Sequence, residues 1–426
     1  MLFHIVFGVI FFVLLFVLIS LEVVNKTILA LLGGVLFVTM GIINQELAYE
    51  EVDWNVIFLL IGMMVIVGIT KKSGLFQYIA IKAAKLVNGD PVKILILFSL
   101  VTAILSALLD NVTTVLILTP VIILISVELG LNPTPFIISS AMASNIGGMA
   151  TLIGDPPNIM IGSAAGLGFM EFIINMGPLV LILLVVHAGL ILIFFKKDMN
   201  VNMERRARIM DFDENASITD KGILIKSISV LGVVLVLFSL HEITHLEPST
   251  VALGGAALLM LLAGGEEVEE FFHEVEWSTI FFFIGLFIMV GGLVELGVID
   301  FLAGKYLALT NGDIKITSAS IIWVSGFLSA FLDNIPYVAT MIPLVDKLGE
   351  EIGRTAIEPV WWSLAIGACL GGNGTLIGAS ANVVSAGISG RSGYKISFIE
   401  FTKYGMIVMV ATLIVSTAYV YLRYLI

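Results

Sequence analysis

The chain has few charged residues and almost no cysteine. Charged residues make up 13% of its 426 residues, about half the share that is usual in soluble domains. Hydrophobic residues make up 59%, so water cannot be the main solvent of the folded chain. The single cysteine, Cys369, excludes an internal disulfide and a cysteine-built zinc cluster.

Motifs of nucleotide-driven pumps and of common enzymes are missing as well. The sequence contains no phosphate-binding P-loop, which excludes ATP as the direct driving force. It has no His-Glu-x-x-His and no Gly-x-Ser-x-Gly motif, so an intramembrane enzyme is a weak alternative. The net charge of -12 lies mostly in loops such as 46–53 and 266–276, which predicts no nucleic-acid partner. We expect no enzyme activity and no cofactor apart from a coupling ion.

Long apolar stretches fill most of the sequence. Many of them can cross about 30 Å of hydrocarbon, which predicts an all-α polytopic protein embedded in the lipid bilayer. The first stretch lacks a basic flank and an Ala-x-Ala site, so we expect a retained span and no cleaved signal peptide. Examples of these stretches are the ranges 5–20, 28–43, 56–70, 179–195, 223–240, 251–263, 280–294 and 407–422.

The sequence repeats itself once. A constant shift that places Asp110 on Asp333 aligns many other residues of the two halves. We therefore expect two membrane repeats that are joined by a polar linker. The matched pairs include Trp54 with Trp277, Gly62 with Gly285, Gly74 with Gly297, Pro120 with Pro343 and, after a shift of one more residue, Thr151 with Thr375. The expected parts are a first repeat over 1–196, a cytoplasmic linker over 197–221 and a second repeat over 222–426.

Each half places a Leu-Asp-Asn triplet between two apolar arms, at Leu109-Asp110-Asn111 and at Leu332-Asp333-Asn334. In an ordinary spanning helix these polar groups would face lipid at a cost of several kcal/mol. A re-entrant hairpin avoids this cost because its polar tip lies in a cavity lined by protein. We expect such hairpins over about 92–127 and 314–348.

A second polar motif in each half interrupts an apolar stretch with glycines. In the first half it also contains Asp155-Pro156-Pro157-Asn158. Prolines remove backbone donors and glycines permit non-helical dihedral angles, so each helix is expected to break. The breaks expose carbonyl groups and helix ends, which are common components of ion sites. We expect the broken helices over about 135–165 and 358–388.

Three spans, one hairpin and two more spans give five crossings in each half, or about ten in total. Because five is odd, the second repeat is expected to be inverted relative to the first. Lysine and arginine are enriched in cytoplasmic loops. This rule places Lys26 and the linker arginines in the cytoplasm. It predicts that both termini are extracytoplasmic and that the protein is integral to the plasma membrane.

The motif Leu-Asp-Asn-x-Thr-Thr, followed by Gly-Gly-x-Ala-Thr-Leu-Ile-Gly-Asp-Pro-Pro-Asn-Ile, resembles the ArsB/NhaD family of the ion transporter superfamily. Within it, the chain is most similar to the group of the melanosomal P protein and related prokaryotic permeases. It resembles the divalent-anion/sodium symporters more distantly. In those relatives the hairpin tips and broken helices form sodium and substrate sites, in a transport domain that slides against a scaffold. The resemblance implies elevator-type alternating access and a homodimer.

Carried over residue by residue, the resemblance implies two pseudo-symmetric Na⁺ sites. One would use Asp110, Asn111 and the break near 148–154, and the other would use Asp333, Asn334 and the break near 372–378. Each tip has an aspartate where the symporters have a serine, which permits proton coupling as well. The candidate ion- or substrate-binding residues are Asp110, Asn111, Thr113, Thr114, Asn145, Gly148, Thr151, Gly154, Asp155, Asn158, Asp333, Asn334, Asn373, Thr375, Gly378 and Asn382.

Several functions and structural roles stay open at this point. We expect Na⁺/H⁺ exchange, because three carboxylates lie near the centre and the four polar motifs contain no Lys or Arg. A Na⁺- or H⁺-coupled permease for a carboxylate or an oxyanion such as arsenite is the alternative, since helix N-termini can bind anions; a thiolate site for arsenite is disfavoured. A passive ion channel is less favoured. The aspartates could instead cap helices, and the matched Asn and Thr residues could satisfy interhelical hydrogen bonds.

Overall fold

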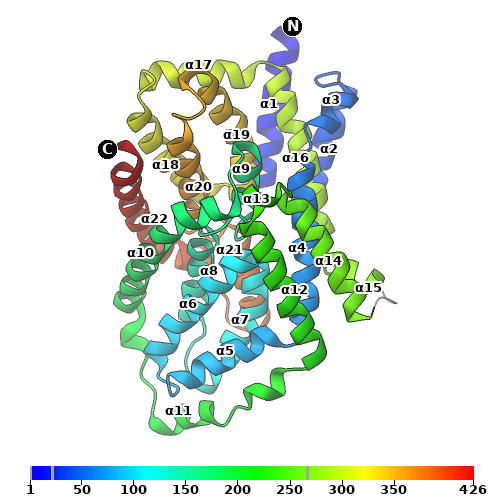
Figure 1. Cartoon of the computed structure of the whole chain (residues 1–426). Coiled ribbons are helices and arrows are strands. Elements are labelled where there is room, and N and C mark those ends of the chain that lie inside the picture. Colours follow the sequence, from blue (N-terminus) through cyan, green and yellow to red (C-terminus); the bar gives the residue numbers. More distant parts are fainter. Residues whose placement is uncertain (1, 21–23, 265–267) are drawn as a thin grey trace.

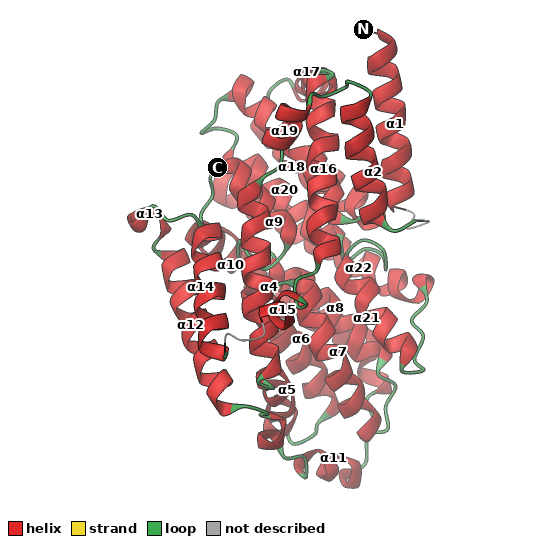
Figure 2. Ribbon diagram, turned by 90° about the vertical axis from the view of Figure 1, so that its right-hand side faces the viewer, coloured by secondary structure: helices red, strands yellow, loops and turns green. Residues whose placement is uncertain are grey.

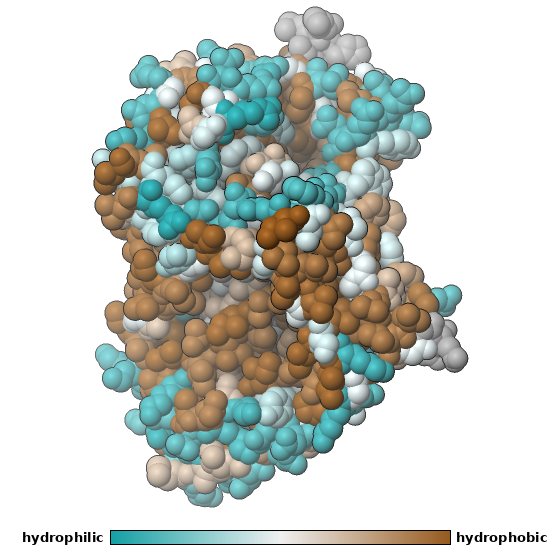
Figure 3. Space-filling view, in the orientation of Figure 1, coloured by the Kyte–Doolittle hydropathy of each residue, from teal (hydrophilic) through white to brown (hydrophobic). Residues whose placement is uncertain are grey.

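The computed structural model describes residues 2–20, 24–264 and 268–426, and every regular element in this part of the chain is a helix (Figure 1). Eight of the described helices are long and apolar enough to cross a membrane, and three shorter apolar helices accompany them. Apolar side chains form a broad band between two polar ends on the face shown in Figure 3. The expected all-helical polytopic membrane fold is confirmed.

The first part of the chain follows the expected order of spans, hairpin and broken helix, with the helix α5 (Leu75–Leu86) between the third span and the hairpin. The two arms of the hairpin are separated only by Leu109 and Asp110. The helices are α1 (Leu2–Ser20), α2 (Lys26–Thr39), α3 (Gln45–Glu50), α4 (Trp54–Lys72), α5 (Leu75–Leu86), α6 (Pro91–Leu108), α7 (Asn111–Glu128), α8 (Thr134–Gly148), α9 (Pro156–Ala165) and α10 (Phe169–Phe195).

A polar connection with the short helix α11 (Met203–Met210) leads to the second part, which has the same order of elements. Glu266 and Glu267, which belong to the expected acidic loop, lie outside the described residues. The helices are α12 (Lys221–Ser239), α13 (His241–Thr244), α14 (Pro248–Ala263), α15 (Val268–Phe272), α16 (Trp277–Glu295), α17 (Val298–Thr310), α18 (Ile314–Phe331), α19 (Asn334–Ile352), α20 (Glu358–Gly371), α21 (Ser380–Arg391) and α22 (Phe398–Val420).

Aspartates start all four hairpin helices by accepting backbone N–H groups of the first turn. Asp90 and Asp313 cap the first arms, α6 and α18. Asp110 and Asp333 cap the second arms, α7 and α19, at the hairpin tips. An N-cap aspartate satisfies helix donors that otherwise have no partner. The capping role considered for the tip aspartates is therefore present in the structure.

The matching elements of the two parts lie at opposite ends of the molecule, as an inverted repeat requires. Figure 1 shows helix α5 near one end and its counterpart α17 near the other, and Figure 2 shows the same. Each hairpin packs on the broken helix of its own half, through α6 with α8 and α18 with α20. Other contacts cross between the halves, through α2 with α16, α4 with α14, α7 with α21 and α9 with α19. The polar tips and breaks thus meet at the centre.

Candidate functional site

The two helix breaks are built alike. Asn158 donates from its side-chain amide to the carbonyl of Gly148 at 3.2 Å and to that of Thr151 at 2.9 Å. Asn382 donates in the same way to the carbonyls of Gly372 at 2.7 Å and Thr375 at 3.0 Å. These bonds satisfy carbonyl groups that lose their helical partners at the break. The two asparagines therefore hold the broken segments in shape.

Close backbone contacts explain the glycines of the first break. A Cβ atom on Gly148 would lie 2.4 Å from the carbonyl oxygen of Gly154, and a Cβ on Gly154 would lie 2.4 Å from that of Gly148. The break is also fastened to its hairpin, because the Thr151 hydroxyl donates to the carbonyl of Ala107. In the second half the Thr375 hydroxyl donates to the equivalent carbonyl of Ala330. Both threonines hold backbone segments together.

At the first hairpin tip, polar atoms are left without a protein partner. Asp110 accepts the backbone N–H of Thr113 at 2.7 Å, and no described residue forms an ion pair with it. Asn111 donates to the side-chain oxygen of Asn145 at 3.2 Å. Within the described chain, the Asn111 side-chain oxygen and the Thr114 hydroxyl have no hydrogen-bond partner. Both residues are at least 98% buried, with 2% and 1% exposure.

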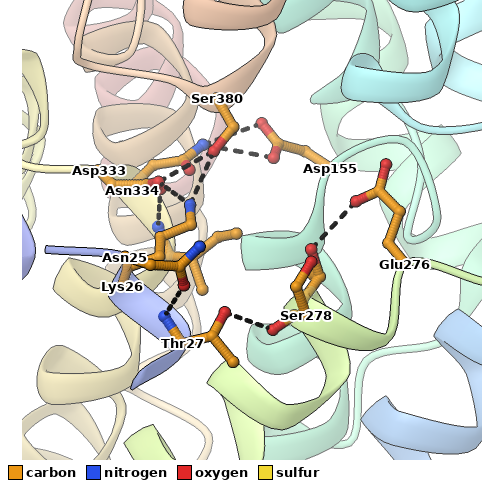
Figure 4. Close-up of polar contacts among 11 residues, drawn as sticks. Asn25, Lys26, Thr27, Asp155, Glu276, Ser278, Asp333, Asn334 and Ser380 are labelled. Carbon is orange, nitrogen blue, oxygen red and sulfur yellow. Dashed lines mark hydrogen bonds and ion pairs between the residues drawn. The ribbon is translucent and has the colours of Figure 1, made fainter. Parts of the chain in front are cut away.

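At the second hairpin tip, other side chains bind the aspartate carboxylate and the asparagine side-chain nitrogen (Figure 4). Asp333 accepts the ammonium of Lys26 at 2.7 Å and the hydroxyl of Ser380 at 3.0 Å. Asn334 donates to both carboxylate oxygens of Asp155 at 3.3 Å. Asp155 is fully buried and makes no capping bond to helix α9, although that helix does begin at Pro156. Its partner is the opposite hairpin, so the side-chain capping role considered for it is wrong.

The candidate residues form connections across the halves that the sequence did not predict. Asn145 donates to Asn373 at 2.9 Å and to Asn382 at 3.2 Å. Both of these partners belong to the second half, just as Asp155 of the first half binds Asn334. The structure thus brings the tips and breaks of both halves into one polar centre. Gly378 lies in the second break against the carbonyl oxygen of Gly372, which a Cβ would approach to 2.9 Å.

A cavity of about 220 Å³ lies beside the first tip and contains residues that sequence reasoning missed. Its polar lining includes Asp110, Lys26, Glu276, Thr279 and Ser380. The loop-charge rule uses Lys26 only as a marker of the cytoplasmic side, whereas the structure places its partly buried ammonium against the tip of the second hairpin. The repeat itself offered one signal, because the aligned Ser380 replaces a proline of the first break. The remaining lining is apolar and includes Leu60, Met63, Met64, Leu109, Val112 and Leu116.

The chemistry of the centre suits a hard cation or a proton. Carboxylate, amide and hydroxyl oxygens gather there, and these are the ligands that hard cations prefer. Among the described residues, no cluster of three His, Cys, Asp or Glu side chains could hold a transition metal. Cys369 is fully buried, and its thiol lies 3.5 Å from the side-chain oxygen of Asn158. A thiophilic ion therefore has no multidentate site here.

Comparisons with known proteins place the chain among transporters. Residues 16–367 match the family model CitMHS, described as "Citrate transporter". An uncharacterized transporter of Mycobacterium tuberculosis is 46% identical over 411 residues, which is 95% of both chains. The 46 kDa membrane protein of Mycobacterium leprae is 44% identical over 96% of both chains. The P protein of Sus scrofa is 33% identical over 94% of this chain and 57% of its own length. The expected similarity to the P protein is confirmed, and the finer ArsB/NhaD assignment stays a prediction.

Proposed function

Because the chain belongs to the citrate transporter family, we propose that it is a secondary transporter that exchanges Na⁺ for H⁺. The observation that carries this proposal is the incomplete site at the first hairpin tip. There the Asp110 carboxylate has no basic partner among the described residues, and the buried oxygens of Asn111 and Thr114 accept no hydrogen bond. A bound cation would supply the missing partner for all three.

Energetics favour this interpretation over a purely structural role. A buried polar group without a partner costs about 1–3 kcal/mol, and most buried polar groups in proteins have partners. Two such atoms lie one helical turn apart on the helix that Asp110 caps, and they are oxygen ligands of the kind that a hard cation prefers. The amide of Asn111 is already oriented by Asn145 at 3.2 Å. The site is therefore held in shape before the cation arrives.

Competition between two cations for Asp110 would couple their movements. Sodium binds the ionised carboxylate, whereas the carboxylate without sodium takes up a proton, because burial disfavours its charged form. Only the neutralised site crosses the apolar interior at a low cost. We propose that the hairpins and broken helices move together against helices α2, α4, α14 and α16, as in an elevator. A homodimer would hold this scaffold fixed in the membrane.

A permease for a small carboxylate, driven by the same cation, is the second candidate. The ammonium of Lys26 lines the cavity beside Asp110, and Ser380 adds a hydroxyl group. Helix α21 begins at Ser380, so its N-terminus also points its partial positive charge toward the centre. The family description as a citrate transporter agrees with a carboxylate cargo. In this case the site at Asp110 carries the driving ion.

Flux measurements in proteoliposomes test the proposal. An outward sodium gradient should drive proton uptake in the wild type, and Asp110→Asn should lower this flux at least about tenfold, since a fixed neutral amide cannot exchange the two cations. Asp346→Asn, on the exposed face of α19, is the matched control and should keep the flux. Full sodium-driven flux in Asp110→Asn would contradict the proposal. Sodium-dependent uptake and counterflow of labelled citrate, without net exchange of Na⁺ for H⁺, would favour the second candidate.

A further inference from the structure

The second hairpin tip differs from the first because it already holds a cation. The Lys26 ammonium lies 2.7 Å from the Asp333 carboxylate and 3.0 Å from the Ser380 hydroxyl. It also lies 5.2 Å from the ring centroid of Phe282, within the range of a cation–π interaction. The side chains of Lys26 and Asp333 are 25% and 12% exposed. The ammonium thus sits where an inorganic cation would bind this carboxylate.

The carboxylates of the two tips differ in their ion pairing, because Asp333 pairs with Lys26 and Asp110 pairs with no basic residue of the described chain. Both tip asparagines donate from the side-chain nitrogen, Asn334 to Asp155 and Asn111 to Asn145, and the buried side-chain oxygen of Asn111 has no partner in the described chain. In the repeat alignment, alanine replaces Asp155 at position 379 of the second half. The two halves therefore already differ in sequence at this position, because the second half has no counterpart of the Asp155 carboxylate.

A second pair of equivalent residues differs in the same way. Thr114 of the first tip has an unpartnered hydroxyl. Its counterpart in the repeat alignment is Tyr337, whose hydroxyl lies 3.0 Å from that of Ser325. At the second tip, the Asp333 carboxylate, the side-chain nitrogen of Asn334 and the Tyr337 hydroxyl thus have protein partners, supplied by Lys26, Asp155 and Ser325.

We propose that Lys26 is a tethered cation resident in the site of the second repeat, so that only the site of the first repeat exchanges its cation. This inference rests on the proposed function and sets the number of coupling cations at one for each chain. Lys26 stands at the first turn of helix α2, which packs on α16. Asp333 stands at the tip of the hairpin that would move. The lysine charge therefore remains with the scaffold and does not travel with the cargo.

A long, flexible lysine side chain suits this role. Its ammonium is a compact point charge on a flexible stem of four carbons, so it can stay with one carboxylate and keep it neutralised while the hairpin shifts. Removal of the Lys26 ammonium would leave the partly buried Asp333 carboxylate without a compensating charge, which costs free energy. Loss of Lys26 alone should therefore turn the Asp333 tip into a second site for an inorganic cation. Loss of both Lys26 and the Asp333 carboxylate should not create this second site.

Equilibrium binding of radioactive sodium to the purified full-length protein in detergent tests this inference. The wild type should bind one sodium ion for each chain, and Lys26→Gln should bind two, because the Asp333 carboxylate then needs a new partner. Lys26→Gln combined with Asp333→Asn should return the number to one. Lys347→Gln is the matched control, because Lys347 also pairs with an aspartate, Asp300, at 3.2 Å, but this pair is exposed. The Lys347→Gln variant should bind one sodium ion for each chain, as the wild type does.

The outcomes separate this inference from the proposed function. Two sodium ions bound to the wild type, or one bound to both the wild type and Lys26→Gln, would overturn the role of Lys26 and leave the proposed function intact. No sodium binding by the wild type would overturn both. A misfolded Lys26→Gln would bind none, so the single ion that it must retain at Asp110 reports that the variant is folded. Arginine at position 26 keeps the charge and should also leave one bound ion.

Discussion

Asp155 is a buried carboxylate whose partner comes from the other half of the molecule. Its two oxygens accept the amide of Asn334 at 3.3 Å, and its exposure is 0%. We predict that Asp155→Ala lowers the free energy of unfolding by about 1–3 kcal/mol, since the amide of Asn334 is left without its acceptor. Asp155→Asn retains an acceptor oxygen and should cost less. Thermal unfolding in detergent measures both, and equal losses would contradict a hydrogen-bonding role.

At the scale of residues, the sequence predicted the polar centre but did not predict that Lys26 pairs with Asp333 there. Asp110 and Asp333 are recognisable because each interrupts an apolar stretch at a matched position. Lys26 carries no such mark: it follows one apolar stretch and precedes another, which is also where a cytoplasmic loop charge stands. Its contact with Asp333 spans 307 positions of the chain. Local patterns cannot report a pairing over that separation.

Two crossings between the halves depend on matched glycines. A Cβ on Gly62 would lie 2.6 Å from the carbonyl carbon of Ala252, where α4 crosses α14. A Cβ on Gly285 would lie 2.4 Å from that of Ala30, where α16 crosses α2. Alanine at either glycine should cost about 1–3 kcal/mol, because the two backbones must separate. Thermal unfolding of each variant in detergent checks this.

The same helix pair offers a matched control for the crossing. Gly254 lies on α14, and a Cβ there would meet nothing within 4 Å. Gly254→Ala should be neutral or should stabilise the protein by about 0.5–1 kcal/mol, since alanine favours a helix. If Gly62→Ala and Gly254→Ala behaved alike, close packing at the crossing would not be the reason for the glycine.

At the scale of elements, interrupted patterns predicted the helix pairs of the hairpins and breaks, with bounds that differ from the helices by up to four residues. The first hairpin was expected over about 92–127 and consists of α6 and α7, which run from Pro91 to Glu128. The aspartate that caps the second arm, Asp110, lies two residues after the end of the first arm, so the boundary is local and visible in the sequence. The way that α9 packs on α19, and α7 on α21, is a tertiary arrangement. It decides which tip meets which break, and periodicity alone does not specify it.

For the whole molecule, the linker between the halves is more than a flexible connection. It folds back over the end of the molecule where helix α5 lies (Figure 1). Arg206 pairs with Asp90 at the base of the first hairpin at 3.3 Å, and the backbone N–H of Thr219 donates to the carbonyl of Ser73 at 3.1 Å. The linker therefore contacts the turn between α4 and α5 as well as the base of the first hairpin. Its polar composition predicted a position outside the bilayer but not these contacts.

The ion pair between Lys85 of helix α5 and Glu214 of the linker gives this attachment a pH dependence. The hydrogen bond from Lys85 lowers the pKa of Glu214 below its ordinary value. A lowered carboxyl pKa stabilises the fold above the pKa of the unfolded chain, and this stabilisation is lost as the pH falls through the lowered pKa. We predict that Glu214→Gln lowers the unfolding temperature at neutral pH and that the difference from the wild type disappears in acid. Unfolding followed from about pH 8 to pH 3 would show this.

Glu204→Gln, which removes an exposed partner of Arg208, is the control and should have little effect at any pH. A difference between Glu214→Gln and the wild type that stays constant with pH would mean that the Glu214 charge does not hold the linker.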